Sequence, residues 1–391
     1  MFGPGGWGAK MAEIHGTFDD RFVAMRDLLS ASIDAGTDVG ASVAVTIDGA
    51  PVVDIWGGWA DAEKTKPWQA DTITNVWSTT KTMTSLAALV LVDRGELDVF
   101  APVSKYWPEF AANGKEAVEV RHLMSHTSGV SAWAQPVIVD DIYDWEKSTS
   151  MLAAQEPWWE PGTQSGYHAL NQGHLVGEVI RRVSGQKPGE FFASEIAGPL
   201  GIDFHIGLDP SEYHRIANVI PPPPMEIDFA TLDMNSVLVK TFMGPAPDAS
   251  VAWTTDWRQA DIGAANGHGN ARSVARAQSI IACGGELDGV KLLSPATIDL
   301  IFQVQSSGID LVLGIDSTFG IGYGLPSASY PYFPSGKICF WGGWGGSVII
   351  VDTDRRMTVA YMMNRMDAGL VGDVRGESLV RAAYAAIGVT A

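Results

Sequence analysis

Residues 76–94 read VWSTTKTMTSLAALVLVDR, and this stretch decides how the chain is organised. Within it, apolar residues recur at the three- and four-residue spacing of a buried helix face. They are Met83, Leu86, Ala87, Val90 and Leu91. Arg94 followed by Gly95 is typical of a helix end. The sequence therefore predicts a buried helix that begins near Ser78.

Ser78 and Lys81 are one helical turn apart at the start of that helix, so their side chains share a face. The first turn offers unpaired N–H groups and the positive end of the helix dipole, which favour negative charge. A nucleophilic serine needs such donors and a neighbour that takes its proton. An ordinary helix cap beside a solvated lysine has the same spacing. The segment Ser184-Gly185-Gln186-Lys187 shows it at a predicted helix end, so the spacing alone leaves both interpretations open.

Composition limits the class of protein. A chain of 391 residues suggests two or three domains, and 46% hydrophobic residues suffice for a large core. The net charge of −19 argues against nucleic acid or an anionic membrane as a partner. Cys283 and Cys339 are isolated in sequence, so neither a zinc site nor a disulfide framework is predicted.

No segment has the pattern of a membrane or export signal. The longest wholly apolar run, Leu86–Val92, is far shorter than a membrane span. The N-terminal MFGPGGWGAK lacks the apolar core of a signal peptide. We therefore expect a cytoplasmic protein in which residues 1–11 form a flexible leader.

Predicted strands lie near both ends of the chain. Residues 41–58, ASVAVTIDGAPVVDIWGG, are typical of two strands joined at Asp48-Gly49. Residues 339–365 indicate a second pair that turns at Asp352–Arg356. Further helices are predicted over residues 17–35, 271–283 and 376–386.

The stretch between these ends is mostly helical, with breaks at Pro and Gly. This order predicts an α/β domain built from residues 12–77 and 271–391. A mainly helical domain of residues 78–270 would interrupt it. Ser78 would then lie where the two domains meet, which is a common place for a binding cleft.

Several short motifs follow one another in an order that identifies a family. They are WSTTK at 77–81, LMSHTSG at 123–129, PGTQSGYH at 161–168 and WGGWGGS at 341–347. In this order the chain resembles the penicillin-recognising serine hydrolases, specifically the family VIII carboxylesterases, which look like class C β-lactamases. The resemblance covers residues 20–391. It implies an α/β plus all-α, β-lactamase/transpeptidase-like fold, with an antiparallel sheet flanked by helices and an inserted helical domain.

The resemblance also implies roles for individual residues. Ser78 matches the nucleophile and Lys81 the lysine of the S-x-x-K motif. Tyr167 matches the tyrosine of the second motif, Y-x-N, although the chain has Tyr167-His168-Ala169 and lacks the Asn. Trp341-Gly342-Gly343 takes the place of the third motif, Lys-Thr-Gly or His-x-Gly. We expect the oxyanion to bind the N–H of Ser78 and one from the Trp341–Trp344 strand, that of Trp344.

A general base is needed because a serine hydroxyl is a poor nucleophile. Free Tyr and Lys both titrate near about 10, so neither is a base at neutral pH without help. We expect Lys81 to lower the pKa of Tyr167, so that Tyr167 takes the proton of Ser78 and returns it to the leaving alkoxide. Desolvation can also lower the pKa of Lys81. The sequence leaves open which of the two is the acylation base.

The third motif bears on the substrate. Relatives that bind β-lactams or peptides use a lysine there to attract a carboxylate, whereas Trp341 offers an N–H donor and an apolar face. We therefore expect cleavage of small uncharged carboxylic esters through a Ser78 acyl-enzyme. A class C-like β-lactamase or D-Ala-D-Ala carboxypeptidase is the alternative. A non-catalytic protein with the same fold is the third hypothesis.

No cofactor or metal is expected. His122 and His126 have helical spacing, but Leu123 stands where the H-E-x-x-H zinc motif needs Glu. A structural turn is the better interpretation of this segment. The expected partner is a small ester, and the sequence leaves a homo-oligomer possible.

Overall fold

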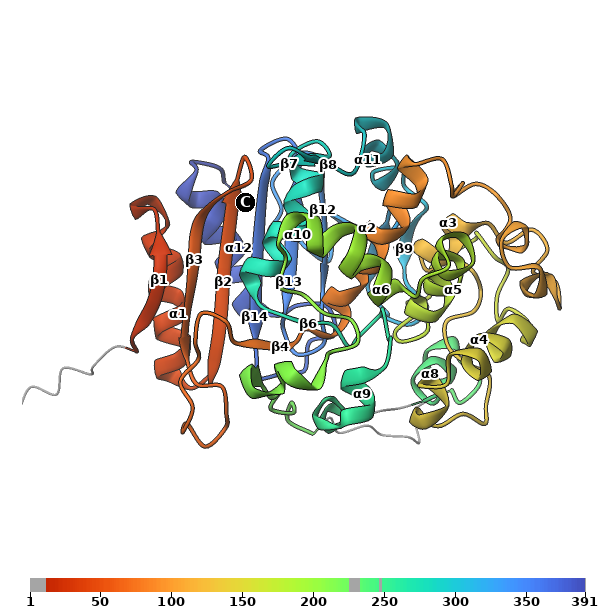
Figure 1. The fold of residues 1–391 in the computed structure, drawn as a ribbon, viewed down its shortest axis with the longest axis horizontal. Coiled ribbons are helices and arrows are strands. Elements are labelled where there is room, and N and C mark those ends of the chain that lie inside the picture. The colour runs from red at the N-terminus through yellow and green to blue at the C-terminus, as the bar shows by residue number, and fades with distance from the viewer. Residues whose placement is uncertain (1–11, 225–232, 246–247, 391) are drawn as a thin grey trace, which may run out of the picture.

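A computed structural model describes residues 12–224, 233–245 and 248–390 (Figure 1). The predicted leader at residues 1–11 lies outside the described residues. Within the described part of the chain, none of the helices combines the length and the apolar character that crossing a membrane requires.

A nine-stranded antiparallel sheet forms one side of the molecule (Figure 1). Its spatial order is β1-β3-β2-β14-β13-β12-β11-β10-β9. The strands are β1 Ile14–Phe18, β2 Gly40–Ile47, β3 Ala50–Gly58, β9 Ser306–Ile309, β10 Asp316–Phe319, β11 Gly324–Leu325, β12 Ile338–Gly342, β13 Val348–Asp352 and β14 Met357–Met363. Because β2 pairs with β14, the two ends of the chain meet in the middle of one sheet.

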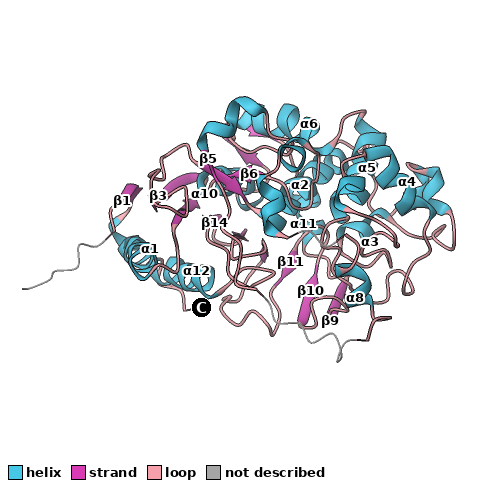
Figure 2. Cartoon of the chain, turned by 90° about the horizontal axis from the view of Figure 1, so that it is seen from below, coloured by secondary structure: helices cyan, strands magenta, loops and turns pink. Residues whose placement is uncertain are grey.

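Helices cover both faces of this sheet. Helices α1 (Val23–Ala35) and α12 (Val374–Ala386) pack together on one face, and α10 (Ala271–Ala282) packs on β2, β13 and β14 from the other (Figure 2). Every residue of β14 is buried, as expected for a strand covered on both sides.

The remaining helices lie mostly beside the sheet. They are α2 Thr80–Asp93, α3 Val120–Met124, α4 Trp145–Ala154, α5 Gln172–Ser184, α6 Pro188–Phe192, α7 Gly198–Leu200, α8 Val237–Phe242, α9 Thr255–Gln259 and α11 Pro295–Ile301. Two small sheets join β4 Ile73–Asn75 with β5 Ile216–Ala217 and β6 His268–Gly269, and β7 Glu286–Leu287 with β8 Val290–Lys291.

The predicted helix α2 is confirmed, and it is buried more completely than its apolar pattern implies. All residues from Thr80 to Leu91 are buried. The polar ones are satisfied internally; for example, Thr80 Oγ1 donates to Trp77 O and accepts from Gly267 N. The antiparallel sheet with flanking helices is also as predicted. The division into residues 12–77 with 271–391 and residues 78–270 stays a prediction, and one continuous apolar core includes residues of both parts.

One predicted element is wrong at its start. The helix expected over residues 17–35 begins only at Val23, because residues 14–18 form the edge strand β1 on β3. The side chain of Asp19 accepts a hydrogen bond from Arg21 N and starts a short 3₁₀ turn between strand and helix.

Candidate active site

Ser78 lies in a single 3₁₀ turn, Trp77–Thr79, that leads directly into α2. Trp77 has a φ of 50°, in the left-handed region that is uncommon for residues other than glycine. Its buried ring packs against Trp257 and Trp344, with centroid distances of 5.6 and 5.0 Å. This packing holds the strained residue immediately before the serine.

Lys81 is buried beside Ser78 and bonds to three oxygens. Its Nζ lies 3.0 Å from Ser78 Oγ, 2.7 Å from Ala169 O and 3.0 Å from Ala264 O. Within the described ranges, no carboxylate forms an ion pair with it. Burial therefore lowers the pKa of Lys81 well below its ordinary value.

Tyr167 contacts the same hydroxyl from another element. Its phenol oxygen donates to Ser78 Oγ at 2.6 Å and accepts from Trp341 Nε1 at 3.3 Å. Burial raises the pKa of Tyr167 well above 10, although its hydrogen bonds with Ser78 and Trp341 oppose the shift. The expected lowering of this pKa by Lys81 is therefore wrong, because desolvation of the phenolate outweighs the other contributions.

The residue that stands in the place of the missing Asn, Ala169, contributes to the site through its main chain. At that position Ala169 uses its carbonyl oxygen to accept a hydrogen bond from Lys81. The intervening His168 turns to a separate partner, with its Nε2 2.7 Å from Ser128 Oγ. Lys81 thus keeps an acceptor without any amide side chain at residue 169.

The third motif approaches Ser78 through glycine. A Cβ on Gly343 would lie 2.4 Å from Val76 O and 3.2 Å from Ser78 N, so a side chain has no room there. The strand β12 ends at Gly342, and residues 343–346 form a turn in which Gly345 and Gly346 have φ of 92° and 129°. Trp344 therefore lies in this turn and not on the strand as predicted.

Two main-chain N–H groups, those of Ser78 and Trp344, donate no hydrogen bond within the described residues. The N–H of Ser78 lies at the start of the helical segment, where intrahelical acceptors are lacking. The N–H of Trp344 makes no hydrogen bond within the part of the chain that the structure describes. Gly343 N, by contrast, donates to Ser347 O at 2.8 Å and is already used. This leaves Ser78 and Trp344 as the candidate donors to an oxyanion.

Two further residues support the site: Asp310, which no motif marks, and His126, which lies in the LMSHTSG motif but is assigned no role there by the sequence. Asp310 Oδ1 accepts the N–H of Tyr167 at 3.0 Å and those of Val312 and Leu313 at 2.8 Å each. It lies 143 residues from Tyr167 in the chain, outside any motif.

His126 is the second of these residues. Its ring packs against Tyr167 and Trp341, with centroid distances of 5.0 and 5.9 Å, and its Nδ1 accepts from His168 N. Because Nδ1 accepts, the imidazole is neutral, and burial lowers its pKa well below the ordinary value. His122 instead accepts from the N–H of Glu119 at the start of α3, so the two histidines act in separate local structures.

The chain is similar to known proteins over most of its length. The β-lactamase family model matches residues 25–383. The chain is similar to the esterase/β-lactamase LipL of Mycobacterium tuberculosis, with 34% identity over 92% of this chain and 84% of that protein.

Two solved structures are similar as well. A family VIII carboxylesterase shares 40% identity with a TM-score of 0.90, covering 96% of this chain and all of that one. A penicillin-binding protein homologue from Caulobacter crescentus shares 36% identity with a TM-score of 0.87 over the same shares. The chain therefore belongs to the β-lactamase family and is a serine hydrolase of the esterase/β-lactamase type.

Proposed function

We propose that the chain is a carboxylesterase that cleaves small uncharged esters through an acyl-enzyme on Ser78. One observation carries the proposal: Ser78 Oγ is within hydrogen-bond distance of both Lys81 Nζ, at 3.0 Å, and Tyr167 Oη, at 2.6 Å. A base and a donor on one hydroxyl are what nucleophilic catalysis by serine requires.

Lys81 is the better candidate for the acylation base. A neutral amine has two hydrogens and one lone pair, and the carbonyls of Ala169 and Ala264 accept two hydrogens. The lone pair is then left for the Ser78 O–H. Because burial lowers its pKa, Lys81 can be neutral at a pH where a free lysine is charged.

In the proposed reaction, Ser78 Oγ attacks the ester carbonyl carbon and its proton moves to Lys81. The oxyanion binds the N–H groups of Ser78 and Trp344. Lys81 then returns the proton to the alkoxide as the carbon–oxygen bond breaks, which releases the alcohol. Water then attacks the acyl carbon while Lys81 takes one of its protons. The bond between that carbon and Ser78 Oγ breaks, Lys81 returns the proton to Ser78 Oγ, and the carboxylic acid leaves.

Tyr167 acts in this scheme as a neutral donor. Its raised pKa keeps the phenol protonated, so its O–H can stabilise negative charge on Ser78 Oγ or on the leaving oxygen. Trp341 Nε1 donates to the same phenol oxygen and fixes the direction of its O–H.

The preference for uncharged esters rests on the side chains around Tyr167 and Trp341. These two residues share a cluster with Val312 and Phe319, and partly exposed Ala169, Val237, Leu313 and Val371 pack against it. None of these eight side chains carries a positive charge that would attract a substrate carboxylate, and such a surface suits an apolar acyl or alcohol group. The names of LipL and of the family VIII carboxylesterase support ester cleavage.

A test would combine turnover of p-nitrophenyl butyrate with labelling by a fluorescent organophosphonate, mapped by mass spectrometry. We expect one label, on Ser78, and loss of both signals in Ser78→Ala. Ser184→Ala is the matched control, because Ser184 has the same spacing to a lysine but donates only to main-chain oxygens. Undiminished turnover in Ser78→Ala would refute the proposal. Nitrocefin hydrolysis with a higher kcat/KM than ester hydrolysis would favour the β-lactamase alternative.

A further inference from the structure

The turn that carries Trp344 is attached to the Ser78 segment on its inner side. Ser347 Oγ donates to Val76 O at 2.8 Å and lies 2.9 Å from Thr79 Oγ1. These contacts fix the end of the turn, at Ser347. Trp344 itself is near the other end, where two glycines with positive φ follow it. Glycines have no side chain to pack, so this part of the turn needs another source of rigidity.

A buried arginine holds the outer side of the same turn. Arg375 Nη2 donates to Gly345 O at 2.7 Å, and Asp367 N donates to the same oxygen at 2.9 Å. Gly345 N donates to Gly369 O at 2.8 Å. The residue after Trp344 is therefore held at both its N–H and its C=O. The C=O of Gly345 and the N–H of Gly346 belong to one planar peptide, and Gly346 N donates to Gly343 O at 3.2 Å. Gly343 O in turn shares a planar peptide with the Trp344 N–H, so holding Gly345 O limits how that N–H can rotate.

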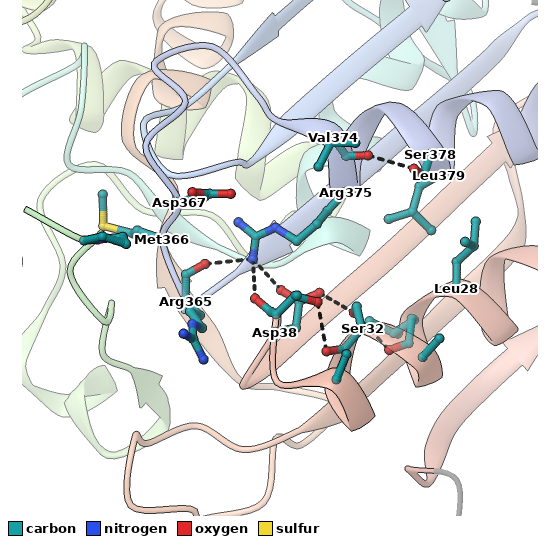
Figure 3. A pocket seen from close by; sticks show the side chains of 15 residues that line it. Leu28, Ser32, Asp38, Arg365, Met366, Asp367, Val374, Arg375, Ser378 and Leu379 are labelled. Atoms are coloured by element: carbon teal, nitrogen blue, oxygen red, sulfur yellow. Dashed lines mark hydrogen bonds and ion pairs between the residues drawn. The ribbon is translucent and has the colours of Figure 1, made fainter. Parts of the chain in front are cut away.

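The guanidinium of Arg375 is itself held by two buried carboxylates, those of Asp38 and Asp373, and Figure 3 shows the first of them. Its Nη1 lies 2.8 Å from Asp38 Oδ1, and its Nη2 lies 2.5 Å from Asp373 Oδ2. Nη1 also donates to Thr37 O and Arg365 O. Asp38 is only 1% exposed and accepts from Ser32 and Tyr361 as well. The planar guanidinium has acceptors for its N–H groups on every side, so these bonds fix its orientation. In that orientation Nη2 points to Gly345 O.

We propose that Arg375 is a positioning residue that sets the Trp344 N–H for the oxyanion. This inference rests on the proposed esterase function, in which that N–H is a donor. Donors to an oxyanion must sit at the right distance before the reaction begins, and a displacement of about 1 Å can cost about 100-fold in rate. The alternative is that Arg375 only stabilises the fold by pairing with Asp38 and Asp373. In that case, removing Arg375 would lower the stability of the protein but leave the activity of each correctly folded active site unchanged.

The space beside Arg375 allows a sharp test. A cavity of about 460 Å³ lies between α1 and α12, and Figure 3 shows Arg375, Asp38 and Met366 at its wall. Truncation to alanine would add the volume of the arginine side chain to this cavity. Ethylguanidinium could then enter and restore the planar set of N–H donors that Arg375 supplies, whereas ethylammonium carries the positive charge without this donor geometry.

The experiment uses Arg375→Ala and Arg375→Lys, with the number of active sites counted by organophosphonate titration. Per active site, we expect kcat for p-nitrophenyl butyrate to fall about 10- to 100-fold, with little change in KM. Affinity for phenylboronic acid, whose tetrahedral adduct places an oxygen anion at the same donors, should fall by a similar factor. Millimolar ethylguanidinium should restore kcat of Arg375→Ala, and ethylammonium should not.

Arg355→Ala is the matched control. Arg355 Nη1 pairs with Asp352, a fully buried carboxylate, at 2.8 Å, but within the described part of the chain none of its hydrogen bonds or ion pairs reaches residues 343–347. The melting temperature of the Arg355→Ala variant should fall, while its kcat per active site and its affinity for the boronate stay unchanged. Arg375→Lys keeps a positive charge near both carboxylates, so it remains informative where the alanine variant does not fold.

Unchanged kcat and boronate affinity per active site in the Arg375 variants would overturn the inference. An equal loss of kcat in Arg355→Ala would do so too, because it would show a general effect of lost stability. Failure of the proposed function looks different: the unaltered protein itself would then show no ester turnover or no label on Ser78.

Discussion

The hydroxyl oxygens of Tyr167 and Ser78 lie 2.6 Å apart, although 89 residues separate them in the chain. On its other side Ser78 meets the amine of Lys81 at 3.0 Å. Burial disfavours the charged form of both partners, so it lowers the pKa of Lys81 and raises that of Tyr167. Burial of the site therefore favours the neutral form of both side chains, so Lys81 can act as a base and Tyr167 as a hydrogen-bond donor.

The pH dependence of kcat/KM distinguishes these two roles. If Lys81 is the base, activity is lost as the pH falls through its lowered pKa, so the acid limb lies well below 10.5. A tyrosinate base with a raised pKa would instead give activity that climbs beyond pH 10. We expect kcat/KM to reach its plateau below pH 10.5, measured with p-nitrophenyl acetate after subtraction of spontaneous hydrolysis. A rate that keeps rising up to pH 10 would assign the base to Tyr167.

Tyr167→Phe removes the phenol oxygen and keeps the ring. We expect kcat to fall about 100-fold or more, because a positioned proton donor contributes roughly that much. The acid limb of the pH profile should stay where it is, since Lys81 keeps its surroundings. Stopped-flow acylation with p-nitrophenyl acetate would measure the loss. A variant with unchanged acylation would remove Tyr167 from the mechanism.

Gly343→Ala tests the close approach of the third motif to Ser78. The new Cβ would lie 2.4 Å from both Ser347 Oγ and Val76 O, and 3.2 Å from Ser78 N. The turn or the Ser78 segment must shift, so we expect esterase activity to fall by about 100-fold. Overpacking of this kind should also cost about 1–3 kcal/mol of unfolding free energy. Chemical denaturation and active-site titration would measure the two effects; a fully active variant would show that the turn can move freely.

The sequence patterns correctly predicted those helices and strands that are determined by residues within a single segment. The Asp48-Gly49 turn fixes the hairpin of β2 and β3, and the apolar spacing after Ser78 fixes α2. Strand β1 was missed because it is a short edge strand whose only sheet neighbour is β3, and its Phe18 continues the apolar pattern of the helix that follows. A pattern in a single segment cannot show such a pairing.

The site divides in the same way. The spacing of Ser78 and Lys81 left their roles open, and the resemblance to the family assigned them; it also placed Tyr167 at the second motif although the Asn is missing. Asp310 and Arg375 contact the site through hydrogen bonds to main-chain atoms of Tyr167 and Gly345. Such contacts leave no motif in the sequence, because a main-chain atom is the same in every residue. The pKa of Tyr167 was predicted in the wrong direction because burial of the phenol is a property of the assembled fold.

A last prediction concerns stability, at a buried carboxyl outside the active site. Asp261 Oδ2 accepts the N–H of Gly189 at 2.8 Å, while its Oδ1 is buried without a hydrogen-bond partner among the described residues. Burial raises the pKa of Asp261 to about 7. The folded state then holds a proton that the unfolded state releases near pH 4. The stabilising contribution of this group is full below the unfolded pKa and is lost as the pH rises to about 7.

Asp261→Asn removes that titration, and its side-chain oxygen can still accept from Gly189. Relative to the unaltered protein, we expect the variant to gain about 1.4 kcal/mol of unfolding free energy per pH unit between roughly pH 4 and 7, with no further gain above that. Urea denaturation of both proteins at pH 4.5, 6 and 8 measures the difference. The buried histidines titrate in both proteins and cancel in the comparison. A difference that is the same at all three pH values would mean that Asp261 is ionised in the folded protein throughout, with a partner that compensates its buried charge.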